Sequence, residues 1–415
     1  MTLADRVADD VRAPLASVDA LLEPATIRER SNNILAAAIA GKTLHFRVDL
    51  ARLDEAAAQV EAATRRRYPA LNIPYHSRWR HFEAGGFDRA AELTRALAGQ
   101  DPAACARARI DLAVVSVLLD AGAGPVWSYR EASTGERFTR SEGLGVASFR
   151  AFMAGSFSAR PGEPCRVDAA ALSQIDGARL AAMFQVDGDN RLVGLDGRAA
   201  LLRRLGEALA MRRNIFGQQA RPGALYDAMV AGGDAVVSAP ALLRALLEGL
   251  GSIWLTGNTL YGVALGDAWR HPHAGGVGPT AGWVPFHKLS QWLAYSLFEP
   301  FEWAGCAVQD RDALTGLPEY RNGGLLLDTG VLALVDAAAA RAVHEVGNEL
   351  VIEWRALTVA LLDLLAARVR VRLGTPDLPL ACVLEGGTWA AGRAIAQELR
   401  GGEPPLSVRS DGTVF

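Results

Sequence analysis

The stretch NELVIEWRALTVALLDLLAARVRV, residues 348–371, decides the fold class of this chain. Its large apolar side chains recur every three to four residues, with Trp354, Leu357, Leu361 and Leu365 on one side, and this spacing predicts a long, buried helix. Elsewhere β-branched residues rarely alternate with polar ones. We therefore expect a mainly α-helical, multi-helix globular fold. The other predicted helices cover residues 24–41, 50–68, 103–120, 172–184, 195–210, 288–298 and 330–346.

The composition is that of a globular protein. The chain has 415 residues, 50% hydrophobic and 21% charged, with a net charge of −3. Arg65–Arg67 and Arg203–Arg204 lie among acids on predicted helix faces, so we expect no nucleic-acid partner. No apolar run approaches the roughly 18–20 residues that span a bilayer, so we expect no membrane partner. Acids within the first ten residues argue against a secretory signal and favour a cytoplasmic location.

The stretch LTGLPEYRNGGLLLDTG, residues 314–330, holds the strongest catalytic candidate. Pro318 before Glu319 and Gly323–Gly324 after it argue against a continuous helix, so the Glu319 carboxylate should project from a loop or a helix start. A phenol and a guanidinium follow at once, at Tyr320 and Arg321. A Glu beside an Arg is also common on exposed surfaces, and this second interpretation stays open.

A second segment, FHKLSQW at residues 286–292, begins a predicted helix on which Lys288 and Gln291 share a face. If that face looks toward Glu319, a buried Lys288 would keep the carboxylate ionised. Alternatively, Lys288 extends its ammonium into solvent.

The segment HSRWRHFE, residues 76–83, combines two Arg, two His and two aromatic residues. In one interpretation the arginines bind a planar anion and the aromatic residues stack on a ring; in the other, the aromatic residues anchor a loop to the core.

Motifs for nucleotide cofactors and for thiol or metal chemistry are missing. No GxGxxG, P-loop or GxSxG pattern occurs in a usable context, and the four cysteines lie far apart with no CxxC pair. His271 and His273 have no third ligand nearby in the sequence, which makes a weak metal signal. We therefore expect no cofactor and no metal.

Over nearly its whole length the chain resembles the uracil-catabolism protein four family of fungi and bacteria. The segments that carry this resemblance are IRERSNNIL, IPYHSRWRHFEAGGFDR, NELVIEWRALTVALLD, EGGTWAAGR and SDGTVF. The resemblance implies a place in a pathway in which uracil enters as its ribonucleotide, the pyrimidine ring is opened, and urea and a three-carbon acid leave.

A more distant resemblance, over the middle and C-terminal two thirds, is to the queuosine-nucleotide salvage glycosidases, helical enzymes similar in fold to helix-hairpin-helix DNA glycosylases. In those enzymes the position of Glu319 is an Asp in an Asp-Tyr-Arg run that acts on the ribosyl carbon, and the position of Lys288 is also Lys. Here Asn-Gly-Gly replaces the Val-Pro-Gln that follows the Arg, so the substrate should not be a deazapurine. The segments that carry this resemblance are DAGAGPVWSY, LGVASFRAFMAG, LVGLDGRAALLRRLGEAL, FHKLSQW, LTGLPEYRNGGLLLDTGVL and NELVIEWRALT.

Together the resemblances imply an N-glycosidase that hydrolyses the N-ribosidic bond of a ring-opened, ribosylurea-type uridine nucleotide. Glu319 would stabilise an oxocarbenium-like ribose and either attack its carbon or activate water. Lys288 would keep Glu319 ionised, and His287 would protonate the departing nitrogen. Candidate substrate-binding residues are Tyr320, Arg321, Gln291, Trp283, Arg80, His81, Arg355, Trp127 and Asp328. For Asp328, capping a helix that begins near Thr329 is an alternative.

The expected organisation is an N-terminal helical segment with an aromatic and basic loop at 1–100, a glycosidase-like helical core at 101–375, and a C-terminal tail packed on that core at 376–415. Two other classes of function stay open. One is an amidohydrolase-type enzyme that cuts a C–N bond of a ureido intermediate with a metal held by His271, His273 and an acid. The other is a non-catalytic pathway partner, in which side chains would fill the space around Glu319.

Overall fold

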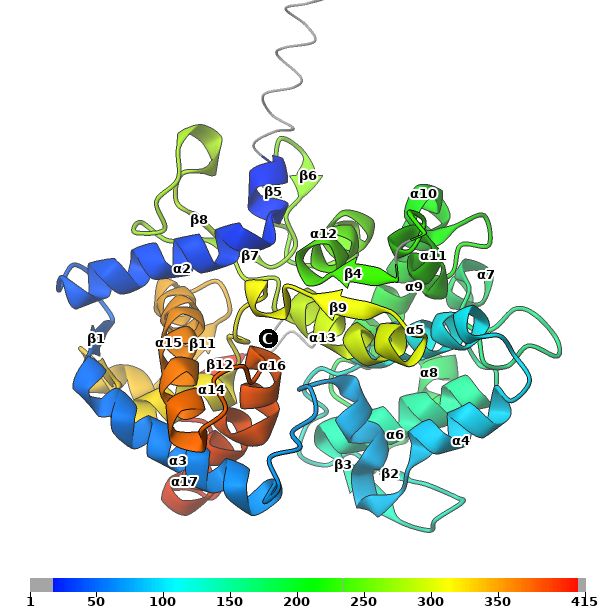
Figure 1. The fold of residues 1–415 in the computed structure, drawn as a ribbon, viewed down its shortest axis with the longest axis horizontal. Coiled ribbons are helices and arrows are strands. Elements are labelled where there is room, and N and C mark those ends of the chain that lie inside the picture. Colours follow the sequence, from blue (N-terminus) through cyan, green and yellow to red (C-terminus); the bar gives the residue numbers. More distant parts are fainter. Residues whose placement is uncertain (1–17, 234, 410–415) are drawn as a thin grey trace, which may run out of the picture. The chain divides into compact units, whose positions relative to one another are not determined.

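The computed structural model describes residues 18–233 and 235–409 (Figure 1). Within these ranges the protein is mainly helical, which confirms the predicted fold class. None of the described helices is long and apolar enough to cross a membrane. The prediction about the first ten residues lies outside the described ranges.

The described residues form two compact units, each assembled from separate stretches of the chain. Unit 1 contains the residues up to His76, Gly257–Gln291 and Arg311–Arg409, and unit 2 contains Ser77–Thr256 and Trp292–Asp310. Helix α13 (Lys288–Trp303) contributes its first turn to unit 1 and the rest to unit 2.

Unit 1 contains helices from the N-terminal and C-terminal parts of the sequence, together with short strands. Its α-helices are α2 (Pro24–Ile39), α3 (Leu53–Arg67), α14 (Tyr320–Asp328), α15 (Glu349–Leu373), α16 (Leu380–Val383) and α17 (Trp389–Arg400), and a π-helical turn, η8 (Leu384–Thr388), joins the last two. Its 3-10 helices are η1 (Leu50–Arg52), η5 (Gly278–Thr280), η6 (Arg311–Ala313) and η7 (Ala337–Arg341). Its strands are β1 (Phe46–Val48), β5 (Thr259–Leu260), β6 (Val263–Ala264), β7 (Ala268–Arg270), β8 (Trp283–Pro285), β10 (Leu332–Leu334), β11 (Val343–Glu345) and β12 (Ser407–Arg409).

Helix α15 forms the centre of unit 1, with α2 and α3 packed against it (Figure 1). It corresponds to the apolar stretch from which the sequence predicts a long buried helix. The Asn348 side chain caps its start by accepting the N–H of Leu350, and Gly374 ends it in the left-handed region at φ 72°. Most of its first four turns are buried, including Trp354 and Leu357, so packing on several sides holds this helix.

The predicted helix at 330–346 is wrong. Gly330 has φ 74°, which ends α14, and the chain then forms β10, η7 and β11. Strand β10 pairs antiparallel with β1, and β11 pairs parallel with β12. These partners lie far away in sequence, so the alanine-rich local pattern could not reveal the pairing.

Unit 2 is built around α5 (Pro102–Leu118), which packs against α6 (Arg140–Met153) and α11 (Leu225–Met229). Its other α-helices are α4 (Arg89–Ala96), α7 (Ala169–Leu172), α8 (Gly177–Met183), α9 (Leu195–Met211), α10 (Arg213–Phe216) and α12 (Ala239–Leu250). Its 3-10 helices are η2 (Arg78–Gly86), η3 (Pro222–Ala224) and η4 (Gly251–Ile253). Its strands form an antiparallel pair, β2 (Ser128–Arg130) with β3 (Arg137–Thr139), and a parallel pair, β4 (Val236–Ser238) with β9 (Ala307–Gln309).

The single helix predicted at 172–184 is also wrong, because it is divided into α7 and α8. The Asp168 side chain accepts the N–H of Ala171 at the start of α7, and Asp176 accepts the N–H of Arg179 at the start of α8. Each aspartate therefore begins its own short helix, which a reading by apolar spacing alone does not detect.

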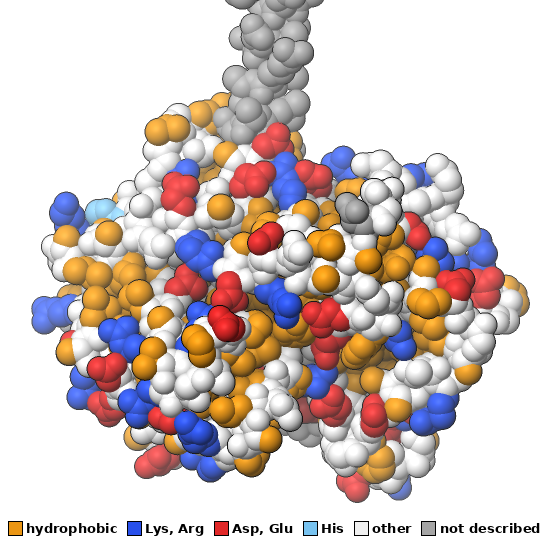
Figure 2. Space-filling model, viewed as in Figure 1, with side chains coloured by type: hydrophobic (Ala, Val, Ile, Leu, Met, Phe, Trp, Pro, Cys, Tyr) orange, Lys and Arg blue, Asp and Glu red, His pale blue; other side chains and the backbone are white. Residues whose placement is uncertain are grey.

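Basic residues are interspersed with acids on the face shown in Figure 2. The two arginine clusters of the sequence, Arg65–Arg67 and Arg203–Arg204, follow this pattern in part. Arg65 pairs with Glu61 at 3.0 Å, and Arg67 pairs with Glu385 at 2.6 Å. Arg203 instead donates to the carbonyl of Ile175.

Candidate active site

The Glu319 carboxylate caps the N-terminus of α14. Its Oε2 accepts the backbone N–H of Arg321 at 2.7 Å, and its Oε1 accepts that of Asn322 at 2.6 Å. Glu319 itself is extended, with φ −119° and ψ 163°, because the helix begins only after it. The carboxylate thus projects from a helix start, where the helix dipole favours its ionised form.

Opposing effects act on the protonation of Glu319. Burial raises its pKa above the usual value, whereas the two backbone N–H bonds and the positive charges of Lys288 and His76 lower it, and the net direction is upward. Lys288 and His76 are therefore electrostatic neighbours of Glu319. A carboxyl group with a raised pKa beside cationic partners is typical of catalytic acids and bases, although structural ion pairs also shift pKa values.

Gln291 ties the loop before Glu319 to the first turn of α13. Its wholly buried amide donates to the Thr315 hydroxyl at 2.9 Å and to the Phe286 carbonyl at 3.0 Å, and it accepts the N–H of Thr315 at 2.9 Å. Because Lys288 lies in the same turn, these bonds fix the turn that carries Lys288 relative to the loop that leads to Glu319.

A second carboxylate, Glu385, lies in the π-helical turn and gathers three partners. His76 Nδ1 lies 2.9 Å from its Oε2, and Arg67 and Tyr68 donate to its Oε1 at 2.6 and 3.0 Å. Burial raises the pKa of Glu385, but the hydrogen bond and charge of His76 and the charge of Arg67 outweigh it and lower the pKa to about 2. Glu385 is therefore ionised at neutral pH and holds the His76 ring in place.

The π-helical turn needs Gly386 and Gly387 because α3 passes directly beside it. A Cβ on Gly387 would lie 2.4 Å from the Val60 carbonyl oxygen, and one on Gly386 would lie 3.1 Å from the Thr64 hydroxyl. The structure shows one helical run through α16, η8 and α17. Single π-helical turns inside α-helices are frequent at functional sites.

Sequence reasoning missed the pairing of His76 with Glu385. Both residues lie in segments that carry the family resemblance, but 308 intervening positions separate them and neither has a recognisable motif. The geometry adds His76 and Glu385 to the site, with the charge of His76 acting on Glu319 and on Glu385 alike.

His287 and Arg355 are engaged with protein partners around Asp267. His287 Nε2 lies 3.1 Å from the Leu21 carbonyl, so its Nε2–H donates to the backbone, and burial lowers the His287 pKa. Arg355 donates to both oxygens of Asp267, at 2.8 and 2.7 Å, in a fully buried pair. Asp267 also accepts the N–H of Lys288 at 3.0 Å, so this pair fixes the start of α13.

The remaining predicted residues of unit 1 lie on several elements. Tyr320 is 38% exposed and the Arg321 guanidinium stacks over its ring at 4.7 Å. The Arg270 guanidinium stacks over Trp283 at 4.2 Å. Asp328 ends α14 and pairs with Arg400 at 2.7 Å, and since no helix begins at Thr329, its predicted capping role there is wrong.

Three predicted substrate-binding residues lie in unit 2. Arg80 pairs with Glu299 at 2.5 Å, and the His81 ring meets Trp292 edge-on at 5.7 Å. Trp127 is fully buried, and its indole N–H donates to a backbone carbonyl at 2.9 Å, which makes it a core residue of this unit.

The histidines of the metal-dependent alternative do not point to a common ligand. His271 Nδ1 accepts the N–H of His273 at 3.2 Å, whereas His273 Nε2 lies 3.1 Å from the Lys42 carbonyl. Within residues 18–233 and 235–409, side chains with the spacing of metal ligands gather instead at His45, Glu349 and Glu353.

Comparison with known proteins places the whole fold in one family. A family model described as "Protein of unknown function (DUF1688)" matches residues 20–415. The chain belongs to this family. The DUF1688 match includes both units and every element that carries Glu319, Lys288, His76 and Glu385.

Two curated proteins are similar to this chain of the DUF1688 family. Uracil catabolism protein 4 of Lachancea kluyveri is 38% identical over 409 residues, which cover 90% of this chain and 93% of that protein. Protein urg3 of Schizosaccharomyces pombe (strain 972 / ATCC 24843) is 38% identical over 416 residues, which cover 96% of this chain and 99% of that protein.

Proposed function

We propose that this protein acts in uracil catabolism and hydrolyses the N-ribosidic bond of a ring-opened, ribosylurea-type uridine nucleotide. The observation that carries the reaction type is the Glu319 carboxyl, whose pKa is raised by burial and lowered by its neighbours Lys288 and His76. Support for the pathway comes from the printed name of the relative in Lachancea kluyveri, Uracil catabolism protein 4.

Glu319 acts on the ribose side of the bond. As the bond from the anomeric carbon to nitrogen breaks, positive charge develops on the ribose, and an ionised carboxylate stabilises it. A carboxylate has about four lone-pair positions, and the backbone of α14 uses two of them, so Glu319 retains acceptor capacity for the attacking water. Water adds to the anomeric carbon, and Glu319 accepts its proton.

His76 acts on the leaving group. Urea nitrogen leaves poorly as an anion and needs a proton, which we assign to His76 because Glu385 accepts from its Nδ1–H and stabilises the charged ring. His287 is a weaker candidate, because its Nε2–H donates to a backbone carbonyl. The products are urea and ribose 5-phosphate.

Lys288 and Gln291 position the reacting groups. The charge of Lys288 opposes the rise in the Glu319 pKa and so favours the ionised carboxylate. Gln291 holds the Thr315 backbone and thereby the loop that ends at Glu319. Contacts of Tyr320 and Arg321 with sugar hydroxyls stay predictions.

The test is incubation of the purified protein with ribosylurea 5′-phosphate, ribosylurea, uridine 5′-monophosphate and 3-ureidopropionate, followed by assays of free ribose or ribose phosphate, urea and ammonia. The proposal expects ribose 5-phosphate and urea in equal amounts from the first compound and neither product from the intact nucleotide. A faster reaction with the phosphorylated compound would support recognition of the 5′-phosphate by the protein. Turnover of 3-ureidopropionate alone would instead support the amidohydrolase alternative.

A further inference from the structure

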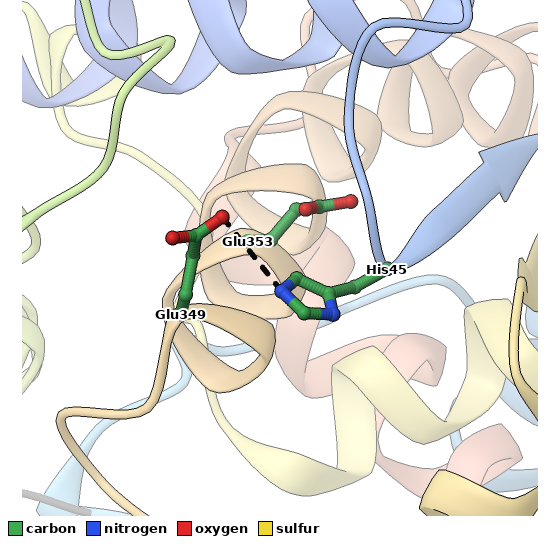
Figure 3. Close-up of side chains that lie close together, drawn as sticks. All are labelled: His45, Glu349 and Glu353. Carbon is green, nitrogen blue, oxygen red and sulfur yellow. Dashed lines mark ion pairs between the residues drawn. The ribbon is translucent and has the colours of Figure 1, made fainter.

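His45, Glu349 and Glu353 form a cluster in unit 1 that the proposed reaction does not use. Each offers a ligand atom, and these atoms all lie within 4.8 Å of one another. Glu349 and Glu353 are four residues apart in the first two turns of α15, so they share one face, and His45 comes from the segment before β1 (Figure 3). His45 Nε2 lies 3.7 Å from Glu349 Oε1.

Buried polar atoms without hydrogen-bond partners distinguish this cluster from an ordinary ion pair. The Glu353 side chain is wholly buried; its Oε1 accepts the N–H of Phe46 at 2.9 Å, but its Oε2 accepts no hydrogen bond. His45 Nε2 is also buried without a hydrogen bond. Leaving a buried carboxylate oxygen and an imidazole nitrogen unsatisfied is costly, and a bound cation would satisfy both.

The charges at the cluster also favour a cation. Among the described residues, the ion pairs of these two glutamates are with histidines, Glu349 with His45 and Glu353 with His271, and not with arginine or lysine. The His271 Nδ1 accepts the N–H of His273, so its Nε2 carries the proton and faces Glu353 Oε2 at 3.7 Å. At this distance the N–H makes no hydrogen bond with Glu353 Oε2, so this oxygen keeps its acceptor capacity for a cation.

We propose that His45, Glu349 and Glu353 bind one divalent first-row transition metal ion such as Zn²⁺ or Mn²⁺. One imidazole nitrogen and two carboxylate oxygens suit these ions, whereas Ca²⁺ and Mg²⁺ prefer oxygen ligands alone. Ligand atoms bonded to a single ion at about 2.0–2.2 Å lie at most about 4.4 Å apart, so the cluster contracts slightly when the ion binds.

A pocket lies beside the cluster, and one of the three proposed ligands, His45, helps to line it. This pocket, of about 250 Å³, is lined by residues that include Leu44, His45, Leu334, Asp336, His344 and Asn348. Three protein ligands with room for a further ligand are typical of a metal that binds water or a small anion in its remaining position. This site goes beyond the proposed ribosyl hydrolysis, whose groups are Glu319 and His76.

The test is equilibrium dialysis of the chelator-treated full chain against Zn²⁺ and Mn²⁺, with metal content and melting temperature measured for the same samples. The proposal expects one ion per chain and a melting temperature that rises with metal concentration. Glu349→Gln and His45→Ala should each weaken binding at least about tenfold and abolish the metal-dependent rise.

Glu345→Gln is the matched control, because Glu345 lies on β11 and pairs with the exposed Arg409. It should bind metal like the unaltered protein. Glu349 is partly exposed, so its variant should fold even where Glu353→Gln does not. Less than about a tenth of an ion per chain, or equal binding by the control and the Glu349 and His45 variants, overturns the proposal. Ribosylurea 5′-phosphate cleavage by the chelator-treated protein separates the two claims, since it can fail or succeed independently of metal binding.

Discussion

The clearest energetic prediction concerns Glu385→Gln. In the folded protein the pKa of Glu385 is about 2, because its bonds with His76 and Arg67 outweigh the effect of burial, whereas its ordinary value is 4.5. The difference of about 2.5 corresponds to roughly 3 kcal/mol, at about 1.4 kcal/mol for each pKa unit. Glu385 is buried, so solvent does little to screen this contribution.

The direction of the pH dependence follows from the lowered pKa of Glu385. Glu385 contributes its stability fully above pH 4.5, where the unfolded chain is also ionised, and this contribution is lost as the pH falls toward about 2. The variant should therefore be about 3 kcal/mol less stable at pH 7, and the difference should shrink steadily between pH 4.5 and pH 3.

The assay is urea unfolding of both proteins at pH 7, 5, 4 and 3, with Glu398→Gln as the matched control. Glu398 is exposed on α17, the helix that follows the turn of Glu385, so its variant should differ from the unaltered protein by less than about 0.5 kcal/mol. A difference for Glu385→Gln that is small at pH 7, or that does not change between pH 5 and pH 3, would refute the reasoning.

Two further predictions concern stability. Burial raises the pKa of Glu299 to about 7 despite its pair with Arg80, so the unaltered protein should lose up to roughly 3 kcal/mol as the pH rises from 4.5 through 7. Glu299→Gln should remove this loss. If the urea midpoint falls by the same amount between pH 5 and pH 8 in the variant and in the unaltered protein, the prediction is wrong. Gly387→Ala should cost about 1–3 kcal/mol, because its Cβ would meet the Val60 carbonyl at 2.4 Å. Gly188→Ala is the control, because a Cβ there meets nothing within 4 Å, and it should change the melting temperature little. Equal losses of stability in Gly387→Ala and Gly188→Ala would count against the packing argument.

Local patterns predicted the long helices well. Helix α15 follows from apolar spacing together with Asn348 and Gly374 at its ends. Pro318 indicated a loop or a helix start at Glu319, and the structure shows a helix start, but Gly323 and Gly324, which argued against a continuous helix, lie inside α14. These features depend on residues within a few positions of one another, where backbone geometry and helix capping dominate.

Features that depend on distant partners could not be predicted in this way. Strand β10 exists because β1 pairs with it, and the π-helical turn at Glu385 packs against α3, more than 300 residues earlier in the chain. The pair of His76 and Glu385 arises for the same reason. His45 by itself gives no metal signal, and only the fold places it beside the two glutamates at the start of α15.

The interleaving of the two units has the same physical origin. The chain leaves unit 1 after His76, returns at Gly257, and leaves again within α13. One of these crossings lies inside the continuous helix α13, where no break in the sequence marks it.

The measurement that tests the central claim most directly is the rate of ribose 5-phosphate release from ribosylurea 5′-phosphate by Glu319→Gln, compared with the unaltered protein and with Asp101→Asn. Asp101 also caps a helix, α5, with a carboxylate, so its variant controls for the loss of a capping charge. The account predicts that Glu319→Gln lowers the rate at least about 100-fold while the fold is retained, and that Asp101→Asn leaves it unchanged. Release that is undiminished in Glu319→Gln, or absent from the unaltered protein, would contradict it.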